Sequence, residues 1–127
     1  MMAETKTTVR ALVRALDKHK AGNIRVIEVG DLTSLADVFV ICEGGSSTQV
    51  RALADYAEEE LKAQDIAPLR VEGYRSQGWI VLDYGDVVAH VFHHETRTFY
   101  DLERLWKDGR EIDITEFLDN EGDNNAV

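Results

Sequence analysis

A turn of small residues in the first half of the chain could bind a phosphate group. Glu43-Gly44-Gly45-Ser46-Ser47 follows an apolar run and precedes a helical pattern. Its backbone N–H groups would therefore lie at a helix N-terminus, where anions bind well. The turn lacks the lysine of a P-loop and the G-x-G-x-x-G spacing of a dinucleotide-binding loop. Because serine hydroxyls are ordinary helix caps, the pattern favours a plain cap over a phosphate site.

The same turn also matches the start of the nucleotidyltransferase signature, in which two glycines and a serine follow a buried strand. That chemistry needs carboxylates on a following strand to hold divalent metal ions against the nucleotide phosphates. The first acid at a comparable distance is Asp55, and it falls inside a helical pattern. Since the carboxylate pair is missing, a nucleotide-dependent transferase that uses the Gly44-Gly45-Ser46 turn is retained only as an alternative.

Three neighbouring histidines and the one cysteine could ligate a metal or act as a nucleophile. On a strand, His90 and His93 point to opposite faces, whereas His90 and His94 share a face but stand about 13 Å apart. Bonds of about 2 Å to one zinc ion cannot span that distance. Cys42 lies in an apolar run, which raises the pKa of a thiol. We therefore expect strand and surface histidines, a buried core cysteine, and no metal or other cofactor.

Aromatic and acidic side chains gather in the second half of the chain. The aromatics are Trp79, Tyr84, Phe92, Tyr100 and Trp106, and the acids are Asp83, Asp86, Asp101 and Glu103. A sheet with one open side cannot bury both sets of alternating side chains, so some of these aromatics should reach the surface. Aromatic anchors beside acids are typical of a protein-binding patch.

The elements that must position these residues follow from the hydrophobic periodicity. Helical spacing predicts helices over about residues 7–20, 48–64 and 95–106. β-Branched runs and alternation predict strands over about residues 24–29, 36–42, 69–72, 78–83 and 87–93, with a tight hairpin at Gly85. This order predicts a single α/β domain with a mixed sheet of roughly five strands flanked by helices.

Length and composition narrow the function further. The chain has 127 residues, a net charge of −10 and one cysteine, which fit one domain in a reducing compartment without an intramolecular disulfide. So acidic a chain is a poor candidate for gripping nucleic-acid phosphates, and a basic protein surface is the better partner. No apolar run has the length of a signal peptide core or a membrane span. We expect a soluble, cytoplasmic protein.

Most of the negative charge lies near the C-terminus. Residues 111–127 contain six acids and no base, and the last of them have almost nothing to bury. We therefore expect residues 109–127 to form an acidic, flexible C-terminal tail. A short apolar cluster of Ile112, Ile114, Phe117 and Leu118 could let the first part of this tail dock as a turn or helix.

Several sequence blocks resemble the Iojap family of ribosomal silencing factors. They keep their order and spacing across about residues 7–106, and they include Asp37-Val38-Phe39-Val40-Ile41-Cys42-Glu43-Gly44, Val50-Arg51-Ala52, Val71-Glu72-Gly73, Gly78-Trp79-Ile80-Val81-Leu82-Asp83-Tyr84-Gly85-Asp86, His90-Val91-Phe92 and Phe99-Tyr100-Asp101-Leu102-Glu103. Residues 1–108 are accordingly identified as one domain of this family. One departure is Glu43, which stands where a threonine is commoner.

The resemblance implies a nucleotidyltransferase-like fold without catalytic carboxylates, and hence a protein that is not an enzyme. It also implies binding to the large ribosomal subunit through the fourteenth protein of that subunit, at the face where the small subunit docks. Occupying that face blocks subunit joining and lowers translation when nutrients are scarce. A role in large-subunit assembly is the alternative. The resemblance further suggests a homodimer, since family members are often dimers.

By position, the resemblance assigns partner contacts to aromatic, acidic and histidine side chains. They are Trp79, Asp83, Tyr84, Asp86, His90, Phe92, Tyr100 and Glu103. Trp79 is the expected anchor, and the acids would face basic residues of the ribosomal protein.

Overall fold

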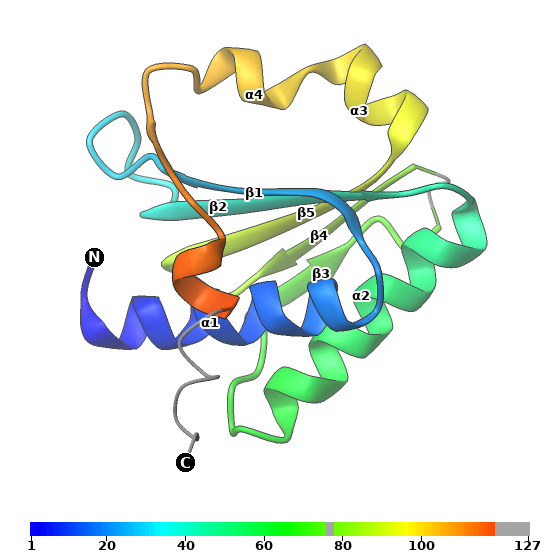
Figure 1. Cartoon of the computed structure of the whole chain (residues 1–127), viewed down its shortest axis with the longest axis horizontal. Helices are drawn as coiled ribbons and strands as arrows, with labels where there is room; N and C mark the ends of the chain where they lie inside the picture. The colour runs from blue at the N-terminus through cyan, green and yellow to red at the C-terminus, as the bar shows by residue number, and fades with distance from the viewer. Residues whose placement is uncertain (76–77, 119–127) are drawn as a thin grey trace.

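Two layers of helices enclose a six-stranded sheet (Figure 1). The structure is a computed structural model that describes residues 1–75 and 78–118, without the side chains of Phe99, Tyr100 and Leu105. Helices α1 (Ala3–Lys18) and α2 (Ser47–Lys62) lie on one face of the sheet, and α3 (His94–Tyr100) and α4 (Leu102–Leu105) lie on the other. This arrangement confirms the predicted α/β fold class.

The strands form a mixed sheet whose spatial order is β3-β4-β5-β2-β1-β6. Their bounds are β1 Gly22–Glu28, β2 Val38–Gly44, β3 Arg70–Glu72, β4 Trp79–Asp83, β5 Val87–His93 and β6 Arg110–Ile112. β2 runs parallel to β5, and each of the other neighbouring pairs is antiparallel. Between β4 and β5 the chain turns at Gly85, whose φ of 89° is a conformation that glycine adopts without strain. The five predicted strands are therefore present.

Helices α1 and α2 bury the apolar stripes that their periodicity predicts. The stripes are Val9, Leu12, Val13 and Leu16 on α1 and Val50, Leu53, Ala54, Ala57 and Leu61 on α2, and each of these is at most 2% exposed. They pack with sheet residues such as Val40 and Cys42 in one cluster. Since burying one valine or leucine side chain contributes about 1.5–3 kcal/mol, this layer supplies most of the packing that holds the sheet in place.

Strand β6 is not among the predicted strands, and it lies within the segment expected to be a flexible tail. Its Ile112 pairs with Val26 of β1 and is 9% exposed. Phe117 is 1% exposed, and its carbonyl oxygen accepts a hydrogen bond of 2.7 Å from Arg14 Nε. The apolar cluster thus docks as predicted, and the fold continues past residue 109 as far as Leu118. For the acidic residues after Leu118, which lie outside the described residues, flexibility stays a prediction.

The predicted helix over residues 95–106 is divided into α3 and α4 by Asp101. This residue adopts a left-handed conformation, with φ 49° and ψ 52°, which ends α3 and turns the chain into α4. Leu102 then faces the sheet in a second apolar cluster with Ile27, Phe39 and Phe92. Among the described residues, none of the helices combines the length and the apolar character that crossing a membrane requires.

Candidate partner-binding site

The register of β4 and β5 places aromatic side chains together on the face of the sheet that carries α3 and α4. Trp79 lies opposite Phe92, and their rings stack with centroids 4.9 Å apart. Trp79 is partly exposed, as an anchor must be, whereas Phe92 is 0% exposed. Phe92 therefore supports the indole from beneath and has no exposed surface for the direct partner contact that the sequence predicts.

His90 is a second buried support for Trp79. The indole Nε1–H donates a hydrogen bond of 3.1 Å to His90 Nδ1, so the ring must be the neutral tautomer that carries its proton on Nε2. The side chain is only 7% exposed, and burial lowers its pKa to about 4. Like Phe92, His90 lies beneath Trp79 and has almost no exposed surface for the predicted direct contact.

Partly exposed apolar side chains continue from Trp79 across the same face. We call Trp79, Val81, Val88 and Trp106 together the Trp79 surface. The ring of Phe39 lies between Trp106 and the His90 ring beneath Trp79. It packs edge-on against both, with centroid distances of 5.5 Å to Trp106 and 4.8 Å to His90. A half-buried apolar patch on a rigid sheet is well suited to bind a protein partner.

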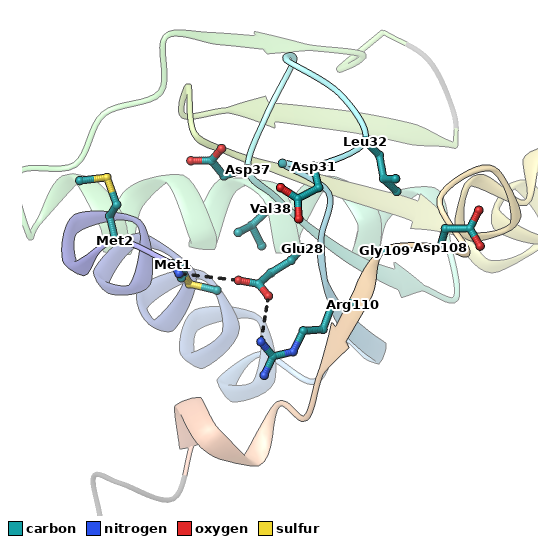
Figure 2. A pocket seen from close by; sticks show the side chains of 11 residues that line it. Met1, Met2, Glu28, Asp31, Leu32, Asp37, Val38, Asp108, Gly109 and Arg110 are labelled. Atoms are coloured by element: carbon teal, nitrogen blue, oxygen red, sulfur yellow. Dashed lines mark ion pairs between the residues drawn. The ribbon is translucent and has the colours of Figure 1, made fainter.

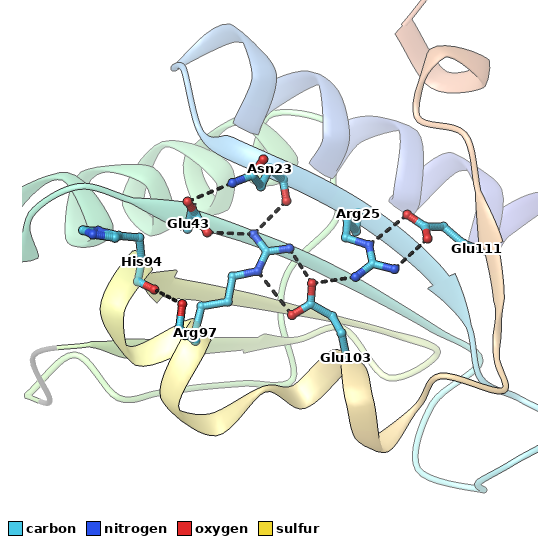
Figure 3. Close-up of polar contacts among 8 residues, drawn as sticks. Asn23, Arg25, Glu43, His94, Arg97, Glu103 and Glu111 are labelled. Carbon is cyan, nitrogen blue, oxygen red and sulfur yellow. Dashed lines mark hydrogen bonds and ion pairs between the residues drawn. The ribbon is translucent and has the colours of Figure 1, made fainter.

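The predicted contact residue Glu103 is instead bound within the chain (Figure 3). Its carboxylate accepts hydrogen bonds from Arg97 Nη2 at 2.7 Å and from Arg25 Nη1 at 2.8 Å. Burial alone would raise the pKa of Glu103, but the hydrogen bonds from the two guanidinium groups hold it below its usual value. Because both oxygens are engaged, Glu103 serves to hold α4 against the sheet.

Arg97 and Glu43 extend this network to the end of β2. Arg97 is 7% exposed and donates to Glu43 Oε1 at 3.1 Å and to the carbonyl oxygen of Asn23 at 2.8 Å. The Asn23 side chain in turn donates to Glu43 Oε2 at 3.0 Å. These contacts explain the unusual glutamate at position 43, because its charge neutralises a buried arginine.

Two acidic residues of the predicted site lie around the β4–β5 hairpin. Asp83 Oδ1 accepts the backbone N–H of Gly85 at 2.8 Å, and Oδ2 pairs with Arg70 at 3.5 Å. Asp86 is exposed at the turn, where Thr5 Oγ1 donates to it at 3.5 Å. Asp83 thus stabilises the hairpin, and Asp86 lies at the end of β5 that is remote from Trp79.

Tyr84 lies on the opposite face from Trp79. It packs against the cluster under α1 and α2, and burial raises the pKa of its hydroxyl. Among the described residues that hydroxyl has no hydrogen-bond partner. The structure therefore does not bring Tyr84 together with the anchor. The side chain of Tyr100, the remaining predicted contact, lies outside the described residues.

The Gly44-Gly45-Ser46 turn forms hydrogen bonds with the first turn of α2, the helix that follows it. Gln49 Oε1 accepts the backbone N–H of Gly45 at 2.7 Å, and Ser46 Oγ accepts the backbone N–H of Gln49 at 3.1 Å. The predicted helix cap is confirmed, and two N–H groups of the turn, those of Gly45 and Gln49, are already engaged. Burial raises the pKa of the Cys42 thiol to about 12, which confirms a core cysteine. Within the described part of the chain, no group of three or more His, Cys, Asp or Glu side chains is placed to hold a metal ion.

A groove of about 470 Å³ lies apart from the Trp79 surface, between the N-terminus, the loop after β1 and strand β6 (Figure 2). Glu28 lies at its centre and pairs with the N-terminal amine of Met1 at 3.8 Å and with Arg110 at 3.6 Å. These ion pairs join the start of α1 to β1 and β6. The groove holds none of the predicted contact residues.

Comparison with known proteins assigns the family. A family model described as ribosomal silencing factor during starvation matches residues 2–126. The chain belongs to the ribosomal silencing factor family. The silencing factor of Halalkalibacterium halodurans is 38% identical over 102 residues, which are 80% of this chain and 87% of that protein. A crystal structure of a Chromobacterium violaceum protein, 32% identical, has a TM-score of 0.78 and covers 89% of this chain and 92% of that one. A mouse protein named mitochondrial assembly of ribosomal large subunit protein 1 is 33% identical over 104 residues, which are 80% of this chain and 46% of that protein.

For this silencing factor, Trp79 stays the predicted anchor, and further apolar side chains lie on the same face of the sheet. Val81 and Val88 lie on the same face as Trp79 and are absent from the predicted contacts, whereas Trp106 was among the aromatics expected to form a binding patch. The alternation of β4 could have found Val81, because residues 79, 81 and 83 must share a face. The role of Trp106 has no such local signal, since it depends on how α4 packs over Phe39.

Proposed function

We propose that this silencing factor binds the large ribosomal subunit through the Trp79 surface and prevents the small subunit from joining. The observation that carries the proposal is a partly exposed indole held in place by a stacked ring and a hydrogen bond. Tryptophans in such surroundings are frequent binding hot spots, because little conformational freedom is lost on association. The partner assigned by the family resemblance is the fourteenth protein of the large subunit.

Charge around the surface supports a basic partner. Glu72 of β3 lies opposite Val81, and Asp83 lies on the same face of β4. Their side chains are 62% and 23% exposed, and both pair with Arg70 at 3.5 Å, so this rim carries two negative charges against one positive charge. Acids at the rim of an interface mainly speed association with a basic surface and make binding depend on salt. The net charge of −10 on the whole chain also favours association with a basic partner.

The mechanism requires occupancy alone. A bound protein excludes the small subunit by steric overlap, so the joined fraction falls as the concentration of the factor exceeds its dissociation constant. No turnover or cofactor is needed. In the cytoplasm of a starved cell, this would lower translation by storing large subunits in an inactive form.

The test is subunit joining in vitro. Purified large and small subunits are mixed with the factor, and a sucrose gradient measures the joined fraction and the factor that sediments with the large subunit. We expect Trp79→Ala to weaken binding by about 30-fold, which corresponds to about 2 kcal/mol, and to leave the fold intact. Leu69→Ala is the matched control. Leu69 is also an apolar residue and is 76% exposed, but it lies before β3 and outside the Trp79 surface. Normal cosedimentation of the Trp79→Ala protein would contradict the proposal.

The enzymatic alternative, a nucleotide-dependent transferase, finds little support at the glycine-serine turn. Binding a phosphate there would first require Gln49 to release the N–H of Gly45. Calorimetry with ATP or GTP and Mg²⁺ separates the two functions. The silencing function expects no heat of binding, whereas a transferase requires it.

The second alternative is an assembly factor without a blocking role, and the name of the mouse relative favours considering it. The same gradient distinguishes it. An assembly factor would sediment with the large subunit and leave the joined fraction unchanged. Light scattering of the purified protein tests the homodimer that the family resemblance suggests.

A further inference from the structure

The contact between Trp79 and His90 spans two strands diagonally. Trp79 lies opposite Phe92 and His90 lies opposite Val81, so the two side chains are diagonal neighbours on one face. Such neighbours are within reach of each other only when the side chains are long or aromatic. The indole Nε1–H reaches His90 Nδ1 at 3.1 Å, and the two ring centroids are 6.0 Å apart.

We propose that His90 is a positioning residue that fixes the indole of Trp79 in the orientation that binds the partner. The inference rests on the proposed function, since it needs Trp79 to be the anchor. Stacking on Phe92 restrains the plane of the indole but has no preferred direction within that plane. The hydrogen bond to a buried acceptor supplies that direction, because only one orientation places Nε1–H against Nδ1.

The cost of burying His90 supports this role. Within the described part of the chain its Nε2 has no hydrogen-bond partner, although the atom is buried. An unpartnered buried donor destabilises the folded state, because it loses its hydrogen bond to water. A phenylalanine would fill the space beside Phe39 and Phe92 without that cost. The histidine therefore requires another explanation, and Nδ1 supplies one by accepting the indole proton.

The hydrogen bond can be measured directly in the unsubstituted protein. In a ¹⁵N-labelled sample, an N–H···N bond gives a scalar coupling between Trp79 Nε1 and His90 Nδ1. Long-range ¹H–¹⁵N correlation reports which ring nitrogen of His90 carries the proton. We expect the coupling to be present and Nε2 to be protonated. A proton on Nδ1, or an indole N–H that exchanges as fast as that of an exposed tryptophan, would overturn the proposal.

Two substitutions then connect the orientation to binding. His90→Phe keeps a ring in the core and removes the acceptor, whereas His90→Asn keeps an acceptor near the position of Nδ1. We expect His90→Phe to shift the Trp79 indole resonance and to weaken binding to purified large subunits by about five- to tenfold. His90→Asn should restore part of both. His94→Phe is the control, because His94 is exposed.

The outcomes separate this inference from the proposed function. If Trp79→Ala loses binding but His90→Phe keeps it, the Trp79 surface stands and the positioning role is wrong. If Trp79→Ala binds normally, both are wrong. If His90→Phe does not fold, the scalar coupling in the unsubstituted protein and the partial rescue by His90→Asn still decide whether the bond exists and matters.

Discussion

Arg97 of α3 and Glu103 of α4 meet across Asp101, the left-handed residue that separates the two helices, with Nη2 and Oε2 2.7 Å apart. Arg97 also donates to Glu43 of β2, so a single guanidinium group joins both helices to the sheet. This contact determines where α4 lies, and α4 in turn presents Trp106 to the Trp79 surface.

Replacing Arg97 by methionine should destabilise the fold by about 3–5 kcal/mol. Methionine fills a similar volume, but the carboxylates of Glu43 and Glu103 would lose a buried cationic partner. Urea unfolding monitored by circular dichroism measures the free energy of unfolding. Tryptophan fluorescence should change as well, since Trp106 directly follows α4.

Arg110→Met is the matched control for this change. Arg110 also pairs with a glutamate, but its side chain is 80% exposed and the distance to Glu28 is 3.6 Å. An exposed pair of this kind contributes about 1 kcal/mol or less. If Arg97→Met and Arg110→Met lost the same stability, the ion pairs of Arg97 would contribute no more to folding than an exposed pair.

Tyr84→Phe should leave binding to the large subunit unchanged and increase stability slightly. The hydroxyl of Tyr84 is buried without a hydrogen-bond partner among the described residues, and its removal should gain about 1 kcal/mol. Because Tyr84 faces α1 and α2, the Trp79 surface is not altered. Thermal unfolding and cosedimentation test the two halves of this prediction, and lost binding would place Tyr84 at the interface after all.

His90 should make the fold sensitive to acid between about pH 6.5 and 4. Burial lowers its folded-state pKa to about 4, from an unfolded value of 6.5. Between these values the unfolded chain binds the proton more readily, so the contribution of His90 is complete above pH 6.5 and is lost as the pH falls toward 4. The difference corresponds to roughly 3 kcal/mol.

The measurement is the free energy of unfolding at several pH values across this range. We expect the free energy of unfolding to depend less steeply on pH in His90→Phe than in the unsubstituted protein. His94→Phe, which replaces an exposed ring, is the control and should keep the slope of the unsubstituted protein. Equal slopes in the unsubstituted protein and the His90→Phe variant would show that the pKa of His90 is the same in the folded and the unfolded chain, as for a ring that is not buried.

Local periodicity predicted the fold because each predicted element carries its own pattern. The alternation of Trp79, Val81 and Asp83 and the apolar stripe of α2 depend only on neighbouring residues, so the sequence shows them directly. Strand β6 was not predicted because the acids around Ile112 indicated a solvated segment. Its pairing with β1 is a long-range contact that a local window does not contain.

The site was harder to predict than the fold because side-chain partners are set by tertiary packing. The sequence did not show which aromatics would be exposed: Trp79 is partly exposed, whereas Phe92 and Glu103, which were predicted as contacts from the same kinds of residue, are engaged inside the chain. Position within a family block does not distinguish a side chain that touches a partner from one that supports it. The burial and the hydrogen bonds supply that distinction.

Phe117→Ala tests whether the segment after Gly109 belongs to the folded domain. Phe117 is 1% exposed and belongs to the cluster between the sheet and α1, so its truncation should leave a cavity and cost about 3–5 kcal/mol. Thr115→Ala is the control, because Thr115 is exposed in the same turn and its hydrogen bonds reach only Asp113. Urea unfolding of both variants measures the difference. A stability loss below about 1 kcal/mol for Phe117→Ala would mean that this segment is dispensable for folding, as its acidic composition alone suggests.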